Sequence, residues 1–128
     1  MPARVLIVDD HPSYRQRLSV AAASLGFDVV AECTRGEDAL SSFGRQKAAI
    51  VIIDLHLGGE IDGLALCNLF VELDRHALIV ACSTFSDPEL VERAFRAGAH
   101  RCLRKPFSIE DAARLFENLA TELESTVS

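Results

Sequence analysis

Short apolar runs alternate along the chain with longer segments in which apolar residues recur at helical spacing. The runs have the length of β-strands and cover residues 4–8, 27–33, 48–53, 77–82 and, in a shorter form, 101–103. The third run, Ala48–Ile53, is apolar without alternation, as expected of a strand that helices cover on both faces. Five strands alternating with five helices predict an α/β fold, because right-handed crossovers then build a parallel sheet between two layers of helices.

Proline, glycine and capping residues mark the expected ends of the helices. Pro12 and Pro88 stand where helices begin, and Gly26, Gly44 and Gly98 stand where helices end. The residues expected to cap helix N-termini are Asp62, Asp87 and Ser108, with a capping box of the form T-x-x-E at Thr34–Glu37. No linker rich in Pro, Gly or Ser interrupts this order, so we expect one domain over residues 1–128.

Composition and charge exclude several classes of function. The chain has 128 residues, 49% of them hydrophobic, and a formal net charge of −6, which describes a soluble globular domain. Its Lys and Arg residues do not cluster, so we expect no nucleic-acid binding by this domain itself. No apolar run reaches the ~20 residues of a membrane span and the start lacks a signal peptide, so we expect a cytoplasmic protein without a membrane partner. The four cysteines and four histidines are scattered, which argues against a zinc site.

Polar residues with chemical potential stand at the carboxyl ends of the expected strands. They are Asp9 and Asp10 after the first strand, Asp54 after the third, Ser83 and Thr84 after the fourth, and Lys105 after the fifth. In an open α/β sheet, ligands bind beyond these ends, near the point where the strand order reverses. A doubly wound order 2-1-3-4-5 brings these residues to one edge, so we expect them to share one shallow pocket.

The charges of this pocket favour a divalent cation. Three carboxylates and one ammonium sum to −2, and two like charges ~5 Å apart repel by roughly 3 kcal/mol at an effective dielectric of 20. Oxygen ligands of this kind suit Mg²⁺, which binds through one or two carboxylates, waters and a phosphate. A carboxylate can then serve as the nucleophile of a phosphoryl transfer, while metal, lysine and hydroxyl neutralise the phosphoryl oxygens.

The chain resembles the receiver domain of the two-component response regulators from about Val5 to Leu119. The matching motifs are V-L-I-V-D-D-H-P (Val5–Pro12), I-I-D-L-H-L (Ile52–Leu57), I-D-G-L (Ile61–Leu64), S-T-F-S-D-P-E (Ser83–Glu89) and G-A-H-R-C-L-R-K-P-F (Gly98–Phe107). Each motif alone is weak, but all of them in order at the expected strand ends are highly specific. The resemblance implies a flavodoxin-like fold.

The resemblance also implies roles for individual residues. Asp54 would accept the phosphoryl group, and Mg²⁺ would be held by Asp9, Asp10, Asp54 and the backbone carbonyl of His56. The Ser83 hydroxyl and the Lys105 ammonium would contact the phosphoryl group, with Thr84 offering a competing hydroxyl. The peptide bond between Lys105 and Pro106 would be cis.

The function that the resemblance implies is a signalling switch and not an enzyme. A sensor histidine kinase or phosphotransfer protein would donate the phosphoryl group, and the surface of the fourth helix, fifth strand and fifth helix would then change. The charged residues of this surface are either a plain solvated face or the docking site for a partner or a second copy of the chain. They are Glu89, Arg93, Arg96, Glu110 and Arg114.

Three departures from the family pattern bear on mechanism. Thr84 stands where the family usually has Ala or Gly, and its bulk should slow exchange with small phosphodonors and slow hydrolysis. Cys102 aligns with the usual switch aromatic, and a thiol cannot reproduce the change of exposed surface that Tyr or Phe makes. The loop after Asp54 has Gly58 in place of proline and one extra residue near Glu60, so we expect it to be more mobile.

Other interpretations of the same residues stay open. Asp9 and Asp10 could merely cap the first helix, and Asp54 could be an ordinary turn residue. A phosphatase or phosphomutase with an aspartyl nucleophile would need a carboxylate two residues after Asp54, where His56 stands instead. A binding module that keeps the fold without the phosphorylation cycle is the main alternative. The D-D-H-P opening also resembles receivers that precede a helix-turn-helix output domain.

Overall fold

The computed structural model describes residues 3–84 and 87–127, with side chains described up to Glu124. Within these residues the chain forms five strands and five helices in strict alternation. The strands are β1 (Arg4–Val8), β2 (Asp28–Cys33), β3 (Ile50–Asp54), β4 (Leu78–Thr84) and β5 (Arg101–Lys105), and the helices are α1 (Pro12–Ser24), α2 (Gly36–Arg45), α3 (Gly63–Leu73), α4 (Pro88–Arg96) and α5 (Ile109–Val127). Phe85 and Ser86, which belong to the motif Ser83–Glu89, lie outside the described residues.

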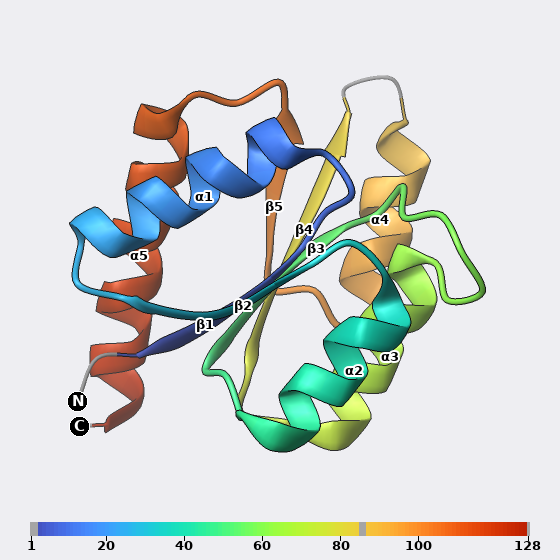
Figure 1. Cartoon of the computed structure of the whole chain (residues 1–128), viewed down its shortest axis with the longest axis horizontal. Coiled ribbons are helices and arrows are strands. Elements are labelled where there is room, and N and C mark those ends of the chain that lie inside the picture. The colour runs from blue at the N-terminus through green and yellow to red at the C-terminus, as the bar shows by residue number, and fades with distance from the viewer. Residues whose placement is uncertain (1–2, 85–86, 128) are drawn as a thin grey trace.

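All strand pairs are parallel, and the order across the sheet is β2-β1-β3-β4-β5. The expected doubly wound, flavodoxin-like topology is therefore confirmed. Helices α1 and α5 cover one face of the sheet, and α2, α3 and α4 cover the other (Figure 1). The strand order reverses between β1 and β3, so the ends of these two strands flank the position where this fold binds ligands.

The core consists of one apolar layer on each face of the sheet. Alternate residues of β1 enter different layers: Val5 and Ile7 pack with α1 and α5, whereas Leu6 and Val8 pack with the opposite helices. Every residue of β3 is buried, which confirms that this strand is covered on both sides. Because two close-packed layers clamp the central strands, the strand ends have little freedom to shift.

The helix N-caps agree with the sequence in three cases and differ in one, and Gly44, which was expected to end a helix, lies inside α2 one residue before its end. Asp62 and Asp87 cap their helices by accepting the amides of Ala65 and Leu90 at 2.8 and 3.0 Å. Ser108 and Asp111 exchange reciprocal hydrogen bonds at the start of α5. The capping box expected at Thr34–Glu37 was wrong.

The reason for that error is the start of α2, which begins one residue later than the box requires. The N-cap is Arg35, and no side chain caps the helix there. Glu37 instead accepts the backbone amide of Ile61 at 3.3 Å, and so ties α2 to the loop that follows β3.

The fourth and fifth strands extend further than the sequence indicated. Thr84 pairs with Lys105 in the register of β4 and β5, so the Ser83, Thr84 and Lys105 positions are fixed by strand pairing rather than by a loop. No helix within the described residues combines the length and apolar character required to cross a bilayer.

Candidate active site

The polar residues predicted at the strand ends lie on one edge of the sheet. Register sets their positions: Val8 pairs with Ile53, which places Asp9 beside Asp54, and Asp54 pairs with Cys82. The pairing of Thr84 with Lys105 then continues this edge across β4 and β5. The arrangement follows from parallel strands of matched length, whose carboxyl ends meet at the same level of the sheet.

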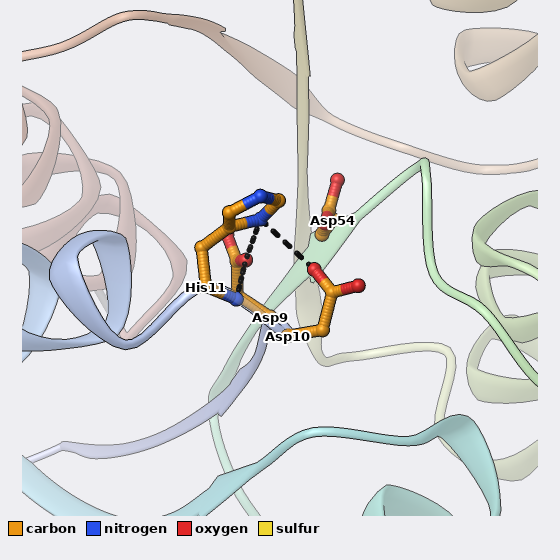
Figure 2. A group of neighbouring side chains, drawn as sticks. All are labelled: Asp9, Asp10, His11 and Asp54. Atoms are coloured by element: carbon orange, nitrogen blue, oxygen red, sulfur yellow. Dashed lines mark hydrogen bonds and ion pairs between the residues drawn. The ribbon is translucent and has the colours of Figure 1, made fainter.

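The carboxylates of Asp9, Asp10 and Asp54 form a compact acidic group. One carboxylate oxygen from each, together with a ring nitrogen of His11, lies within 4.8 Å of all the others. Figure 2 shows Asp9, Asp10 and His11 at the turn after β1 and Asp54 at the end of β3. Asp9 and Asp54 are both 1% exposed, whereas Asp10 is exposed at the rim. The group therefore has a buried floor and an open side.

Backbone amides hold the two buried carboxylates in place. Asp9 Oδ1 accepts the amide of His11 at 2.9 Å, and Asp54 Oδ1 accepts the amide of His56 at 3.0 Å. These local bonds fix the rotamers of both side chains. Asp54 Oδ2 is buried and accepts no hydrogen bond from any described residue. One oxygen of Asp54 is thus anchored and the other is available.

The ammonium of Lys105 lies between the two buried carboxylates. Its Nζ is 2.8 Å from Asp9 Oδ2 and 3.5 Å from Asp54 Oδ2, and its side chain is 5% exposed. Burial alone would lower the pKa of Lys105, but the hydrogen bond to Asp9 and the charge of Asp54 outweigh it and raise the pKa. Lys105 is therefore a permanently charged partner of the acidic group.

The pKa of Asp54 is raised above the usual value of an aspartate. Burial is the largest cause, and the charges of Asp9 and Asp10 add to it. The amide of His56 and the charge of Lys105 act in the opposite direction. The ionised carboxylate of Asp54 is thus held at high free energy, which favours any reaction or ligand that removes its negative charge.

Ser83 and Thr84 occupy different environments at the end of β4. Ser83 is fully buried, and its hydroxyl lies 3.4 Å from both His56 Nε2 and the carbonyl oxygen of Thr84. Thr84 is half-buried and lines a pocket of about 510 Å³ together with Asp54 and Lys105. Thr84 thus lies on the wall of the pocket that contains Asp54, and the effect of its bulk on access to Asp54 stays a prediction.

The pocket also contains four further residues, and the sequence analysis gave no role to two of them, His11 and Tyr14. Its remaining lining comes from His11, Tyr14, His56 and Pro106. His11 Nδ1 lies 2.9 Å from Asp10 Oδ1, and the ring of Tyr14 lies under the Lys105 ammonium. A signal was available for Tyr14, because an aromatic residue in the first turn of a helix points back towards the strand ends. The peptide bond between Lys105 and Pro106 is cis, as the resemblance implied.

The cysteines do not take part in this site through thiolate chemistry. Burial raises the pKa of Cys102 despite the charge of Arg104, and it raises the pKa of Cys67 to about 12. Cys82, which pairs with Asp54 on the neighbouring strand β4, is fully buried, and its pKa is raised well above the usual value, mainly by burial. These thiols stay protonated and act as small apolar side chains.

The residues of the acidic group fit a hard divalent cation. Three carboxylates converge, two of them buried, and only one ammonium opposes their charge. Asp54 Oδ2 accepts no hydrogen bond from any described residue and has only the Lys105 ammonium near it at 3.5 Å, so a cation or a transferred group can still satisfy this buried oxygen. Oxygen donors with an open, solvent-facing side are typical of sites that keep several waters on the metal.

The chain is similar to bacterial signalling and regulatory proteins over most of its length. The chemotaxis protein CheY of Thermotoga maritima is 33% identical over 107 residues, which are 84% of this chain and 88% of that protein. The transcriptional regulatory protein PdtaR of Mycobacterium tuberculosis is 36% identical over 111 residues, which are 87% of this chain and 53% of PdtaR. This chain thus spans about half of PdtaR and most of CheY.

Solved structures share the fold over the whole chain. The receiver domain of AraT, a response regulator from Geobacillus stearothermophilus, superposes with a TM-score of 0.91 at 23% identity and covers 100% of both chains. A putative response regulator from Chloroflexus aurantiacus gives a TM-score of 0.83 at 28% identity, over 92% of this chain and 97% of that one. The family model of the response regulator receiver domain matches residues 5–117. The chain therefore belongs to the receiver domain family of the two-component response regulators.

Proposed function

We propose that this protein is a phosphorylation switch in which Asp54 accepts a phosphoryl group from a phosphohistidine of a sensor histidine kinase or phosphotransfer protein. One observation carries the proposal: Asp54 Oδ2 is buried, accepts no hydrogen bond, and lies 3.5 Å from the Lys105 ammonium. A carboxylate oxygen in this setting is both available as a nucleophile and next to a cation that can receive the phosphoryl charge.

The transfer follows from these positions. Asp54 Oδ2 forms a bond to phosphorus as the bond between phosphorus and the donor imidazole nitrogen breaks, and the imidazole keeps the electron pair. Asp54 Oδ1 stays on the His56 amide, so the carboxylate does not rotate during the step. The Lys105 ammonium pairs with the Asp54 carboxylate before the transfer and with the phosphoryl oxygens after it. The raised pKa of Asp54 supports the reaction, since in the acyl phosphate the charge leaves the poorly stabilised carboxylate and is carried by the phosphoryl oxygens next to Lys105.

The acidic group would hold Mg²⁺ during the transfer. Asp9, Asp10 and Asp54 would supply carboxylate oxygens, and the backbone carbonyl of His56 a further ligand. When bound, the cation neutralises the developing charge on the phosphoryl oxygens. The chain's own contribution is to keep Asp9 and Asp54 oriented through the amides of His11 and His56, so that no rearrangement of the carboxylates is needed.

The phosphoryl group would change the protein by drawing a hydroxyl towards it. Ser83 is the expected hydroxyl, because its only described side-chain contacts are two long ones, at 3.4 Å, and Thr84 is the competing one on the pocket wall. A shift at the end of β4 would favour a different arrangement of the surface formed by α4, β5 and α5. A hollow of about 440 Å³ between β5 and α5, lined in part by Cys102, Arg104 and Arg114, supports that surface as the docking place of an output partner or a second copy.

We propose that residues 1–128 work as one such receiver, in the cytoplasm, where a kinase would have ATP. The domain would hydrolyse its own aspartyl phosphate slowly and would otherwise not act as an enzyme. Its membership of the receiver family supports this assignment.

Mass spectrometry tests the proposal after incubation of the wild-type chain with Mg²⁺ and a small acyl phosphate. We expect the mass of one phosphoryl group to be added in the wild type and not in Asp54→Ala. Removal of Mg²⁺ by EDTA should abolish the modification. An unmodified wild type would overturn the proposal and favour a receiver-like binding module without a phosphorylation cycle.

A further inference from the structure

We infer that Tyr14 is a positioning residue for Lys105: the face of its ring holds the Lys105 ammonium at the two buried carboxylates and supports it as it shifts towards a phosphoryl group. The inference rests on the proposed function for the phosphoryl group, but not for the contact itself. Lys105 Nζ lies 4.4 Å from the centroid of the Tyr14 ring. At this distance a ring face attracts a cation, most strongly where water is excluded.

The carboxylates alone leave the ammonium incompletely held. The ammonium carries three N–H donors on a flexible stem, but within the described residues it forms ion pairs only with Asp9 and Asp54. The Lys105 side chain is 5% exposed, so little water can reach the rest of the ammonium. The face of the Tyr14 ring, whose centroid lies 4.4 Å from Nζ, supplies a third attraction.

The ring itself has one neighbour on its own helix and one on the segment after β5. Tyr14 packs against Phe107 with ring centroids 4.8 Å apart, and the guanidinium of Arg17 lies 5.1 Å from the Tyr14 centroid. Arg17 also donates a hydrogen bond to the carbonyl oxygen of Phe107 at 3.1 Å. Through these contacts the Tyr14 ring connects α1 with the segment that leads from Lys105 into α5.

A ring suits a cation that must change partners. A hydrogen bond to Asp9 is directional and is lost when Lys105 turns towards oxygens on Asp54. The attraction of a ring face changes little over a displacement of this size, because the negative potential covers the whole face. Tyr14 therefore keeps Lys105 in the pocket during the transfer, when its bond to Asp9 weakens.

Two variants of Tyr14 separate positioning from packing. Tyr14→Phe keeps the ring and loses only the hydroxyl, whereas Tyr14→Leu keeps an apolar side chain against Phe107 and loses the ring face. Phe27→Leu is the matched control. It replaces an aromatic residue that packs on Phe116 in the same core layer, before β2 and so at the opposite end of the strands.

The first readout is the NMR signal of the lysine side chains, which does not depend on phosphorylation. The chain has two lysines, Lys47 and Lys105, so selective lysine labelling gives two resolved ε-methylene signals. We expect a ring-current shift at Lys105 in the wild type, Tyr14→Phe and Phe27→Leu, and its loss in Tyr14→Leu. An unchanged Lys105 signal in Tyr14→Leu would overturn the inference even if the protein accepts no phosphoryl group.

The second readout is phosphorylation by a small acyl phosphate at saturating Mg²⁺. In Tyr14→Leu we expect the maximal rate to fall about tenfold, with the Mg²⁺ affinity and the half-saturating donor concentration within about twofold of the wild type. Tyr14→Phe should restore the rate. An equal loss in Phe27→Leu, a Tyr14→Leu rate equal to the wild type, or no rescue by Tyr14→Phe would each overturn the inference. Failure of the wild type to be modified would instead contradict the proposed function.

Discussion

Lys105 Nζ lies 2.8 Å from Asp9 Oδ2, so the buried ammonium is paired most closely with Asp9 rather than with Asp54. This pairing leaves the charge of Asp54 only partly compensated at a position that is 1% exposed. Burial and the neighbouring carboxylates accordingly raise the pKa of Asp54. The site stores unfavourable electrostatic free energy at the residue that we propose as the nucleophile.

Replacing Asp54 with asparagine should therefore stabilise the metal-free protein. Asp54→Asn keeps the shape and the acceptor for the His56 amide but removes the charge. We expect the free energy of unfolding at pH 7 without Mg²⁺ to rise by about 1 to 2 kcal/mol, the scale of one partly compensated like-charge contact. Urea unfolding measures it. Asp28→Asn, at an exposed aspartate at the start of β2, should change stability by less than about 0.5 kcal/mol. A lower stability of Asp54→Asn would show that the charge of Asp54 does not destabilise the metal-free protein.

The same effect should depend on pH with a definite sign. Because folding raises the pKa of Asp54, the folded state binds more protons than the unfolded chain between the two pKa values, and stability falls as pH rises through that interval. The stabilisation by Asp54→Asn should thus be small below about pH 4 and reach its full size above the raised pKa. Unfolding curves of both proteins at a series of pH values test this. A difference that shrinks as pH rises would show that the sign is wrong.

Removing the ammonium should have the opposite effect on stability. Lys105→Met keeps the apolar stem but leaves Asp9 and Asp54 without a cation in the metal-free protein. We expect a loss of about 3 kcal/mol, since breaking a buried ion pair leaves an uncompensated charge. Lys47→Met, at an exposed lysine, is the matched control and should lie within about 0.5 kcal/mol of the wild type. Equal stabilities of the two lysine variants would exclude Lys105 as the electrostatic partner.

The sequence predicted the position of these charges because they depend on strand ends. Asp9 and Asp54 each follow an apolar run, and parallel strands in the order found bring such ends together whatever the details of packing. The burial of all of β3 could also be predicted, since an apolar run without alternation has no polar face to expose. Periodicity and topology are properties of many residues at once, so single deviations do not change them.

The direction of Tyr14 towards the strand ends could be predicted from its place in the first turn of α1, but the partners of its ring, and the partner of Glu37, could not. The position of the Tyr14 ring depends on the roll of α1, which is set by packing against Phe107 far along the chain. Glu37 does not form the expected capping box because its carboxylate accepts a hydrogen bond from the amide of Ile61, in a distant part of the chain. Such contacts depend on tertiary packing. A capping interaction and a hydrogen bond to a distant residue each contribute about 1 kcal/mol, so the local sequence does not show which of the two will form.

Mg²⁺ should stabilise the protein through the acidic group. At a Mg²⁺ concentration of about 100 times Kd, we expect the free energy of unfolding to rise by about 2.7 kcal/mol. Asp10→Asn should lose most of this gain, because it removes one carboxylate of the acidic group. Asp10 is exposed, so the substitution should change the stability of the metal-free protein little. The Asp28→Asn control should keep the gain in full. An equal gain in Asp10→Asn would place the bound ions elsewhere on the protein.

Gly63 should be required for the close approach of α3 to the end of β3, where Asp54 lies. A Cβ atom at this position would lie 2.5 Å from both the Asp54 carbonyl oxygen and the Leu55 Cα atom. Gly63→Ala must therefore displace the end of β3, and we expect a loss of about 3 kcal/mol together with weaker Mg²⁺ binding. Gly44→Ala, in α2, meets no atom within 4 Å and should be neutral or stabilise by about 0.5 to 1 kcal/mol. Similar stabilities of the two variants would show that the end of β3 can shift freely.

Thr84 should limit access of small molecules to the phosphoryl site. Its side chain lines the pocket beside Asp54 and Lys105 and fills space that a smaller residue would leave to a phosphodonor or a water. We expect Thr84→Ala to speed both phosphorylation by a small acyl phosphate and hydrolysis of the aspartyl phosphate, each by about threefold to tenfold. Thr34→Ala, at an exposed threonine after the end of β2 and outside this pocket, should leave both rates unchanged. Because the two rates share one access route, they should rise together in Thr84→Ala. If only phosphorylation became faster, Thr84 would act on the donor rather than on access to Asp54. If both rates equalled those of the wild type, the size of the side chain at this position would not affect the lifetime of the phosphorylated state.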